Sequence, residues 1–202
     1  MQISVALNQT KFEVFRWRDQ AGLPWKITMA ALMAAVVGLL AQVRVPLPFT
    51  PIPLTGQTFG VLLAGVLLGK KWGGASLGIY AVLGIIGVPW FNGATSGLTA
   101  TAGYLVGFIL ASLFLGYFVD KMPDKGSFNR MFGLMLFASI VLVYVPGLLW
   151  LGTWLNLVKG MPTGLLSVIS LGAAPFIARD ILKTGLAAAI AIKILPRKSS
   201  EK

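Results

Sequence analysis

Residues 131–152 read MFGLMLFASIVLVYVPGLLWLG and contain no charged side chain. A helix needs about 20 mostly apolar residues to cross the hydrocarbon core of a bilayer. This stretch therefore predicts a transmembrane helix from Met131 to Gly152. It also indicates that lipid, rather than water, is the main solvent around the rest of the chain.

The composition of the whole chain agrees with this stretch. Of the 202 residues, 56% are hydrophobic and only 11% are charged, and the mean hydropathy is +0.82. A soluble domain carries about 25% charged residues, so this chain has too few charges to cover a globule of its size in water. It is also too apolar to be disordered. The predicted fold class is all-α, a polytopic membrane protein, and a soluble enzyme is excluded.

Five further segments are apolar enough to join this helix, which gives six predicted transmembrane helices. Two of the five are short, and the apolar stretch 155–171 stays open because Lys159, Gly160 and Pro162 interrupt it. The five segments are Ile27–Val43, Thr58–Gly69, Gly74–Val88, Ala102–Val119 and a span within Ser170–Leu195.

The basic residues predict the orientation. Thirteen of the 17 Lys and Arg residues fall in the N-terminal segment, in alternate loops and in the tail, whereas the opposite loops hold only Arg44 and Lys159. By the positive-inside rule we expect both termini in the cytoplasm of a cell-membrane protein, as an even number of spans requires. Because the excess charge is explained in this way, the net charge of +11 does not indicate nucleic-acid binding.

This pattern divides the chain into three parts. Residues 1–25 form a cytoplasmic N-terminal segment, residues 26–195 a six-helix transmembrane domain and residues 196–202 a cytoplasmic tail. The first segment mixes aromatic with basic residues, which is compatible with an interfacial amphipathic helix or, equally, with an unstructured tail.

The two long outward loops are nearly uncharged and rich in Pro, Gly and Thr. The first, residues 44–57, has prolines at positions 46, 48, 51 and 53, which exclude a regular helix and favour an extended segment. The second covers residues 89–101. Such apolar loops are poorly suited to open water, so we expect them to pack over the helices as a lid or a pocket wall. Ordinary ordered connectors are the alternative.

Three charges interrupt the last predicted span. Arg179, Asp180 and Lys183 lie within five residues, and a charge near the bilayer centre costs about 2.5–3.5 kcal/mol on insertion scales. Asp180 and Lys183 are three residues apart and can pair on one helix face. Two cations against one anion would suit a ligand carboxylate, so we expect a ligand site here. A purely structural ion pair is the alternative, with Arg179 extending to the interface.

Catalytic and metal-binding patterns are missing from the sequence. The chain has no Cys and no His, which excludes a disulfide scaffold and a zinc site. No phosphate-binding loop is present, so the chain cannot use ATP by itself. No serine stands in a nucleophile pattern. We therefore expect a protein that is not an enzyme and that requires neither a metal nor a cofactor.

Four stretches of the chain have distinctive motifs. They are the proline-rich run from Gln42 to Gly69, Gly87-Val-Pro-Trp-Phe-Asn-Gly93, Thr101-Ala-Gly-Tyr-Leu-Val-Gly-Phe108 and Pro175-Phe-Ile-Ala-Arg-Asp-Ile-Leu-Lys183. Together they resemble the BioY family, the biotin-binding S components of energy-coupling factor (ECF) transporters, over about residues 26–195.

This resemblance implies a binding site for biotin near the extracellular face, without a cofactor. By position, Asp180 and Lys183 would bond the polar ends of the ligand, and Asn92 and Tyr104 would contribute further contacts. We add Gln57, at the end of the first outward loop, and Arg179, from the charge cluster of the last span, to the expected ligand-binding residues. The loop from Pro46 to Gln57 would close over the site.

The resemblance also implies partners, which are a transmembrane coupling subunit and two cytoplasmic ATPases. Ala30 and Ala34 on the first span resemble the small-residue motif that docks on the coupling subunit. Membrane lipid is the remaining partner.

The sequence is also compatible with two other functions. One is a self-sufficient secondary carrier or channel for a small anionic solute, against which stands the absence of a second acid within the spans for ion coupling. The other is an intramembrane enzyme, against which stands the missing catalytic group.

Overall fold

A computed structural model describes residues 2–122 and 127–196, with side chains from residue 6 onward, and shows a bundle of helices with one short hairpin of strands. The tail predicted for residues 196–202 lies outside the described residues except for Pro196. The helices are α1 (Gln2–Gln20), α2 (Leu23–Gln42), α3 (Gln57–Ile85), α4 (Ala102–Lys121), α5 (Phe128–Phe137), η1 (Ala138–Val143), α6 (Tyr144–Thr153), η2 (Trp154–Val158), α7 (Leu165–Gly172) and α8 (Ala174–Ile194).

Helix α3 contains the first of the two short predicted spans, Thr58–Gly69, and most of the second, Gly74–Val88, which was predicted to extend past the end of the helix at Ile85. Its backbone leaves helical geometry at Gly69, where φ is 74° and ψ is −178°, and the chain reverses direction there. The two halves run antiparallel, since the Gln57 side chain at the start donates a hydrogen bond to the Tyr80 hydroxyl near the end (2.8 Å). Glycine suits position 69 because its φ is positive and because a Cβ there would lie 2.8 Å from an oxygen of Asp120.

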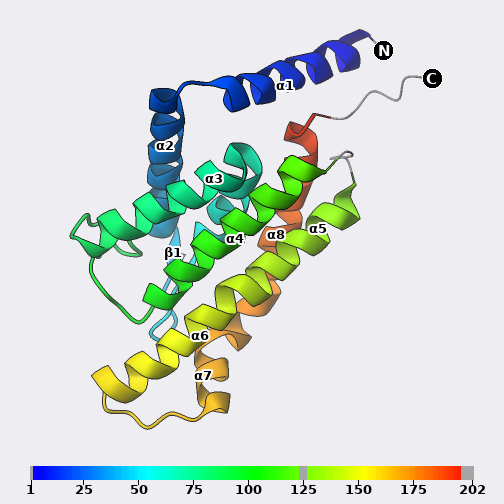
Figure 1. The fold of residues 1–202 in the computed structure, drawn as a ribbon. Helices are drawn as coiled ribbons and strands as arrows, with labels where there is room; N and C mark the ends of the chain where they lie inside the picture. Colours follow the sequence, from blue (N-terminus) through cyan, green and yellow to red (C-terminus); the bar gives the residue numbers. More distant parts are fainter. Residues whose placement is uncertain (1, 123–126, 197–202) are drawn as a thin grey trace.

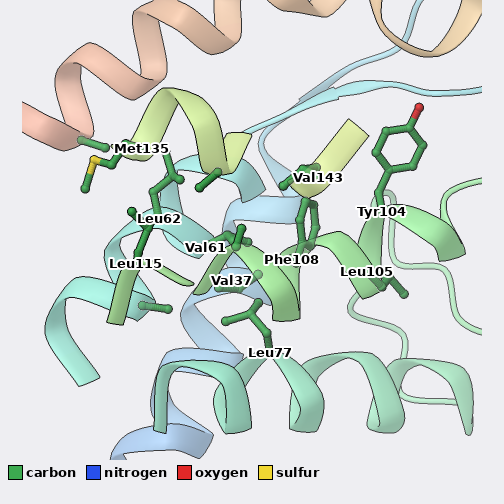
Figure 2. Close-up of a cluster of buried hydrophobic side chains, with 14 of the residues drawn as sticks. Val37, Val61, Leu62, Leu77, Tyr104, Leu105, Phe108, Leu115, Met135 and Val143 are labelled. Carbon is green, nitrogen blue, oxygen red and sulfur yellow. The ribbon is translucent and has the colours of Figure 1, made fainter. Parts of the chain in front are cut away.

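The core is built around α4, which lies between α3 and the helix that contains η1 and α6 (Figure 1). Gly107 allows the close approach, because a Cβ there would come within 2.6 Å of the Val143 backbone. Figure 2 shows Phe108 of α4 beside Val143, and the Tyr104 hydroxyl directed away from the apolar cluster. The packing of α4 therefore turns a polar group toward one end of the bundle.

Among the described residues, three helices are long and apolar enough to cross a membrane. They are α2, α4 and the continuous run Phe128–Val158, and α7 with α8 makes a fourth if this pair, bent by 42°, counts as one span. The stretch 155–171, left open by the sequence, ends the long helix at Val158 and begins α7 at Leu165. A multi-pass membrane protein is confirmed, whereas the number of six spans and the orientation remain predictions.

The N-terminal segment, for which the sequence allowed either a helix or an unstructured tail, forms the helix α1. Figure 1 shows α1 lying across one end of the bundle, on the same side as the end of α8. The Lys11 ammonium donates to the Lys193 carbonyl, and Phe15 is buried against the bundle. The described residues near the two ends of the chain therefore lie at the same end of the molecule.

Candidate ligand-binding site

A cavity of about 60 Å³ lies inside the bundle, bordered by both outward loops and by helices α4, α6 and α8. Its wall combines an ion pair and several hydroxyl and amide groups with a larger apolar surface. The lining residues are Ile52, Pro53, Leu54, Thr55, Gln57, Thr58, Asn92, Thr101, Tyr104, Leu105, Phe108, Val143, Tyr144, Gly172, Phe176, Asp180 and Lys183.

The ion pair between Asp180 and Lys183 is the electrostatic centre of the cavity. Lys183 Nζ lies 2.5 Å from Asp180 Oδ1, and Asp180 is buried with 6% of its surface exposed. The second oxygen, Oδ2, accepts a hydrogen bond from the Tyr144 hydroxyl at 2.5 Å. Lys183 also donates to the backbone carbonyl of Thr55 at 3.0 Å. Each charge thus has an opposite charge and a further hydrogen bond, as burial requires.

A break between α7 and α8 shapes the floor of the cavity. Ala173 leaves helical geometry (φ −129°, ψ −56°), which frees carbonyl groups at the end of α7. The Tyr104 hydroxyl donates to the carbonyl of Gly172 at 2.8 Å, and Thr50 Oγ1 donates to that of Leu171 at 2.6 Å. Broken helices inside a bilayer require such partners. The break therefore connects α4 and the first outward loop to the start of α8.

The first outward loop is anchored by a short antiparallel hairpin. Strand β1 (Arg44–Val45) pairs with β2 (Leu54–Thr55), so the proline-rich segment between them returns to the bundle. Its last residues reach the cavity wall. Gln57, at the start of α3, accepts a hydrogen bond from the Thr55 hydroxyl at 2.9 Å and is buried. The loop is thus a wall of the cavity, as the sequence predicted for a lid or a wall.

The second outward loop is held by Gln42 at the end of α2. Its amide nitrogen donates to the carbonyls of Trp90 (3.2 Å) and Phe91 (3.0 Å), and its oxygen accepts from the backbone of Ala94 at 2.9 Å. These bonds present the half-buried Asn92 to the cavity.

The structure brings together Asp180, Lys183, Asn92, Tyr104 and Gln57 from the predicted set, since all five line the cavity. It does not bring Arg179 to them. Arg179 is exposed and lies outside the lining, because one residue turns a helix by about 100° and Asp180 occupies the inward face. Of the residues that the structure describes, one cation and one anion therefore line the cavity, rather than the two cations and one anion expected from the sequence.

The predicted docking pair also faces the interior. Ala30 and Ala34 are both fully buried, and α2 packs on α3 through this face. The neighbouring small pair, Ala31 and Ala35, is exposed. In both pairs the two alanines are four residues apart, as a docking motif requires. Only the rotation of α2 about its own axis therefore decides which pair is buried and which is exposed. Ala30 and Ala34 therefore serve internal packing in this structure.

Three residues of the site were missed by sequence reasoning. Tyr144 bonds Asp180, the Thr55 carbonyl bonds Lys183, and Gln42 holds the second loop. A tyrosine inside an apolar span was a usable signal for the first, because a buried hydroxyl needs a partner. A π-helical segment, η1, ends at Val143 directly before Tyr144, and such irregular turns often occur at functional sites. A backbone carbonyl leaves no mark in the sequence.

An integral membrane protein whose loops and helices enclose a cavity with a charged pair and an apolar wall is a membrane-embedded binding protein, a class to which transport subunits belong. A family model described as "BioY family" matches residues 11–200, so the chain belongs to the BioY family and is a multi-pass protein of the cell membrane.

Relatives in two organisms carry transporter names. The chain is 45% identical over 140 residues to a "Probable biotin transporter BioY" of Methanothermobacter thermautotrophicus, covering 67% of this chain and 89% of the relative. It is 32% identical over 174 residues to a "Biotin transporter BioY" of Rhizobium etli, covering 80% and 88%. These are names of transport proteins rather than of enzymes.

A solved structure has the same fold. It is described as the S-component for biotin from an ECF-type ABC transporter, and it superposes with a TM-score of 0.73 at 27% identity. The match covers 84% of this chain and 89% of that chain.

Proposed function

We propose that this chain is the substrate-capture subunit, or S component, of an ECF transporter, and that it binds biotin at the Asp180–Lys183 cavity. The observation that carries the proposal is the buried ion pair in a cavity walled by both outward loops, in a chain of the BioY family. The names of the relatives and of the solved structure support the choice of biotin.

The geometry of the ion pair suits the ureido ring of biotin. A ureido group has N–H donors beside a carbonyl acceptor. Asp180 and Lys183 offer an acceptor and a donor only 2.5 Å apart, so they can address the same end of the ligand. We infer that Asp180 accepts from a ureido N–H and that Lys183 donates to the ureido carbonyl. This differs from the expectation that the two residues bind opposite polar ends.

The apolar part of the lining suits the remainder of the ligand. Leu105, Phe108, Val143 and Phe176 offer a surface for the thiophane ring and the valerate chain. Because the loops form the wall, a ligand of this size enters by displacing them. The sequence predicts six crossings and cytoplasmic termini. In that orientation the cavity opens to the extracellular side, opposite the end that carries α1.

The proposed transporter includes a transmembrane coupling subunit and two cytoplasmic ATPases. The sequence has no phosphate-binding loop, so the energy for release comes from these partners. We infer that α2 docks on the coupling subunit through Ala31 and Ala35, whose small exposed side chains permit close helix contact.

Calorimetric titration of the detergent-purified, ligand-free chain tests the binding proposal. We expect one biotin per chain, and retained binding of biotinamide, which keeps the ureido ring but lacks the carboxylate. Loss of biotinamide binding would assign the ion pair to the carboxylate instead. No binding of biotin by folded protein would refute the proposed substrate.

A docking experiment tests the proposed partner surface. Ala31→Trp should abolish co-purification with the coupling subunit and the ATPases while biotin binding persists. The matched variant Ala30→Trp should lower the melting temperature, because its side chain has no space beside α3. Normal co-purification of Ala31→Trp would show that this face of α2 does not dock.

Proteoliposomes that contain the chain alone separate an S component from a self-sufficient carrier. Driven accumulation of biotin under an imposed ion gradient, without the ATPases, would favour the carrier.

A further inference from the structure

A second cavity, of about 300 Å³, lies at the opposite end of the bundle between α1, the start of α2 and the turn of α3. Four cationic side chains and two acidic ones line it, so the cavity has a formal excess of two positive charges. The cations are Arg18, Lys26, Lys70 and Lys71, the acids are Asp19 and Asp120, and the other lining residues are Met29, Leu68 and Trp72.

The acids of this cavity are already engaged by Arg18. Its guanidinium lies 2.6 Å from Asp19 Oδ1 and 3.2 Å from Asp120 Oδ1. Within the described residues, Lys26, Lys70 and Lys71 form no ion pair with a carboxylate. Lys26 donates to a backbone carbonyl, and Lys70 lies over the ring of Tyr117. Three ammonium groups are therefore available to an anion with several oxygens.

An apolar cavity of about 210 Å³ adjoins the basic one. The two share Arg18, Met29 and Leu68, so Arg18 lies at their junction. The other residues of the apolar cavity are Val14, Phe15, Trp17, Leu67 and Ile194. Residues of α1 line both cavities, and Figure 1 shows this helix lying across that end of the bundle. The combined shape fits a molecule with an anionic head and a hydrocarbon chain.

We propose that this double cavity binds one anionic glycerophospholipid from the leaflet next to α1. Its phosphate contacts Lys26, Lys70 and Lys71, and one acyl chain fills the apolar part. Lysines near a membrane surface attract anionic lipids, and the half-buried Trp72 suits the interface. A free phosphate would use the basic half alone, and the adjoining apolar cavity favours the lipid. The lipid thus joins α1 to the bundle.

Native mass spectrometry of the detergent-purified chain, titrated with dioleoylphosphatidylglycerol or dioleoylphosphatidylcholine, tests this proposal. Wild type should retain the anionic lipid preferentially. The double variant Lys26→Gln/Lys71→Gln should weaken its retention about tenfold and leave the zwitterionic lipid unchanged. The matched control Arg16→Gln/Arg130→Gln removes the same charge from exposed positions outside the cavity and should change retention by less than about twofold.

Further arms separate the lipid from a free phosphate. Inorganic phosphate or glycerol 3-phosphate in excess should not displace the lipid, and full displacement would identify a phosphate site and overturn the proposal. Val14→Asp, which places a charge in the apolar cavity from α1, should also weaken retention. If either Lys26→Gln/Lys71→Gln or Val14→Asp retains the anionic lipid as well as the wild type does, the proposed site is refuted. Gel filtration and melting temperature establish folding, and Val14→Asp decides alone if the lysine variant does not fold.

Discussion

The two ends of this molecule use charge in different ways. At the loop end, the buried Asp180 and the half-buried Lys183 form a balanced pair, and each makes one further hydrogen bond, to the Tyr144 hydroxyl and to a backbone carbonyl respectively. At the α1 end, lysines outnumber the acids; Lys70 and Lys71 are exposed and Lys26 is half-buried. A buried charge depends on its particular partner, whereas an exposed one is solvated and screened. Removing one charge should therefore matter much more at the loop end.

Asp180→Asn should give the largest effect. It leaves Lys183 with no anionic partner in a partly buried position and removes the acceptor proposed for the ligand, so biotin affinity should fall by at least about 100-fold, as expected for breaking a buried pair. Calorimetry measures this loss. The neighbouring Arg179→Gln, on the exposed face, is the control and should bind within about threefold of wild type. An equal loss of biotin affinity in Asp180→Asn and Arg179→Gln would contradict the proposed difference between the inward and outward faces of α8.

Tyr144→Phe should give the second largest effect. It removes one hydrogen bond to a buried carboxylate, which is worth about 1.5–3 kcal/mol, and biotin affinity should fall roughly 10- to 100-fold. Tyr104→Phe, which removes only a bond to the Gly172 carbonyl, should cost less. If Tyr104→Phe weakens binding more, the ligand contacts Tyr104 directly and the role of Tyr144 is secondary.

Gly69→Ala tests whether backbone geometry, rather than charge, holds the α1 end. The positive φ and the proximity of Asp120 should together cost about 1–3 kcal/mol, seen as a lower melting temperature. Gly78→Ala, in the second half of α3, is the control, since a Cβ there has no neighbour within 4 Å. A melting temperature unchanged by Gly69→Ala would show that the turn can relax freely.

Asp120→Asn should give the smallest effect. Asp120 pairs with Arg18 at 3.2 Å and accepts from the Lys70 backbone at 3.0 Å, and its side chain is 37% exposed. The loss should be about 0.5–1 kcal/mol of unfolding free energy and should shrink in high salt. Denaturation at two salt concentrations measures it. A loss as large as that of Gly69→Ala, unaffected by salt, would mean that this end also depends on a specific pair.

Local features of the sequence predicted much of the site. Asp180 and Lys183 are three residues apart on one helix, so their pairing follows from helical geometry alone. The prolines of the first loop excluded a helix, and the structure has a hairpin with an irregular segment between its strands. The exposed Arg179 was misplaced because the sequence could not fix which face of α8 points inward.

The sequence by itself determined the solvent, the helical class and the position of the ion pair, because hydropathy and helical spacing act over a few residues. Only the tertiary structure decided which of two equivalent alanine pairs on α2 is buried, which tyrosine meets Asp180, and that the two short spans form a hairpin at Gly69. These features depend on contacts between segments far apart in the chain. A shift of one residue turns a helix by about 100°, and only packing against a neighbour fixes that rotation.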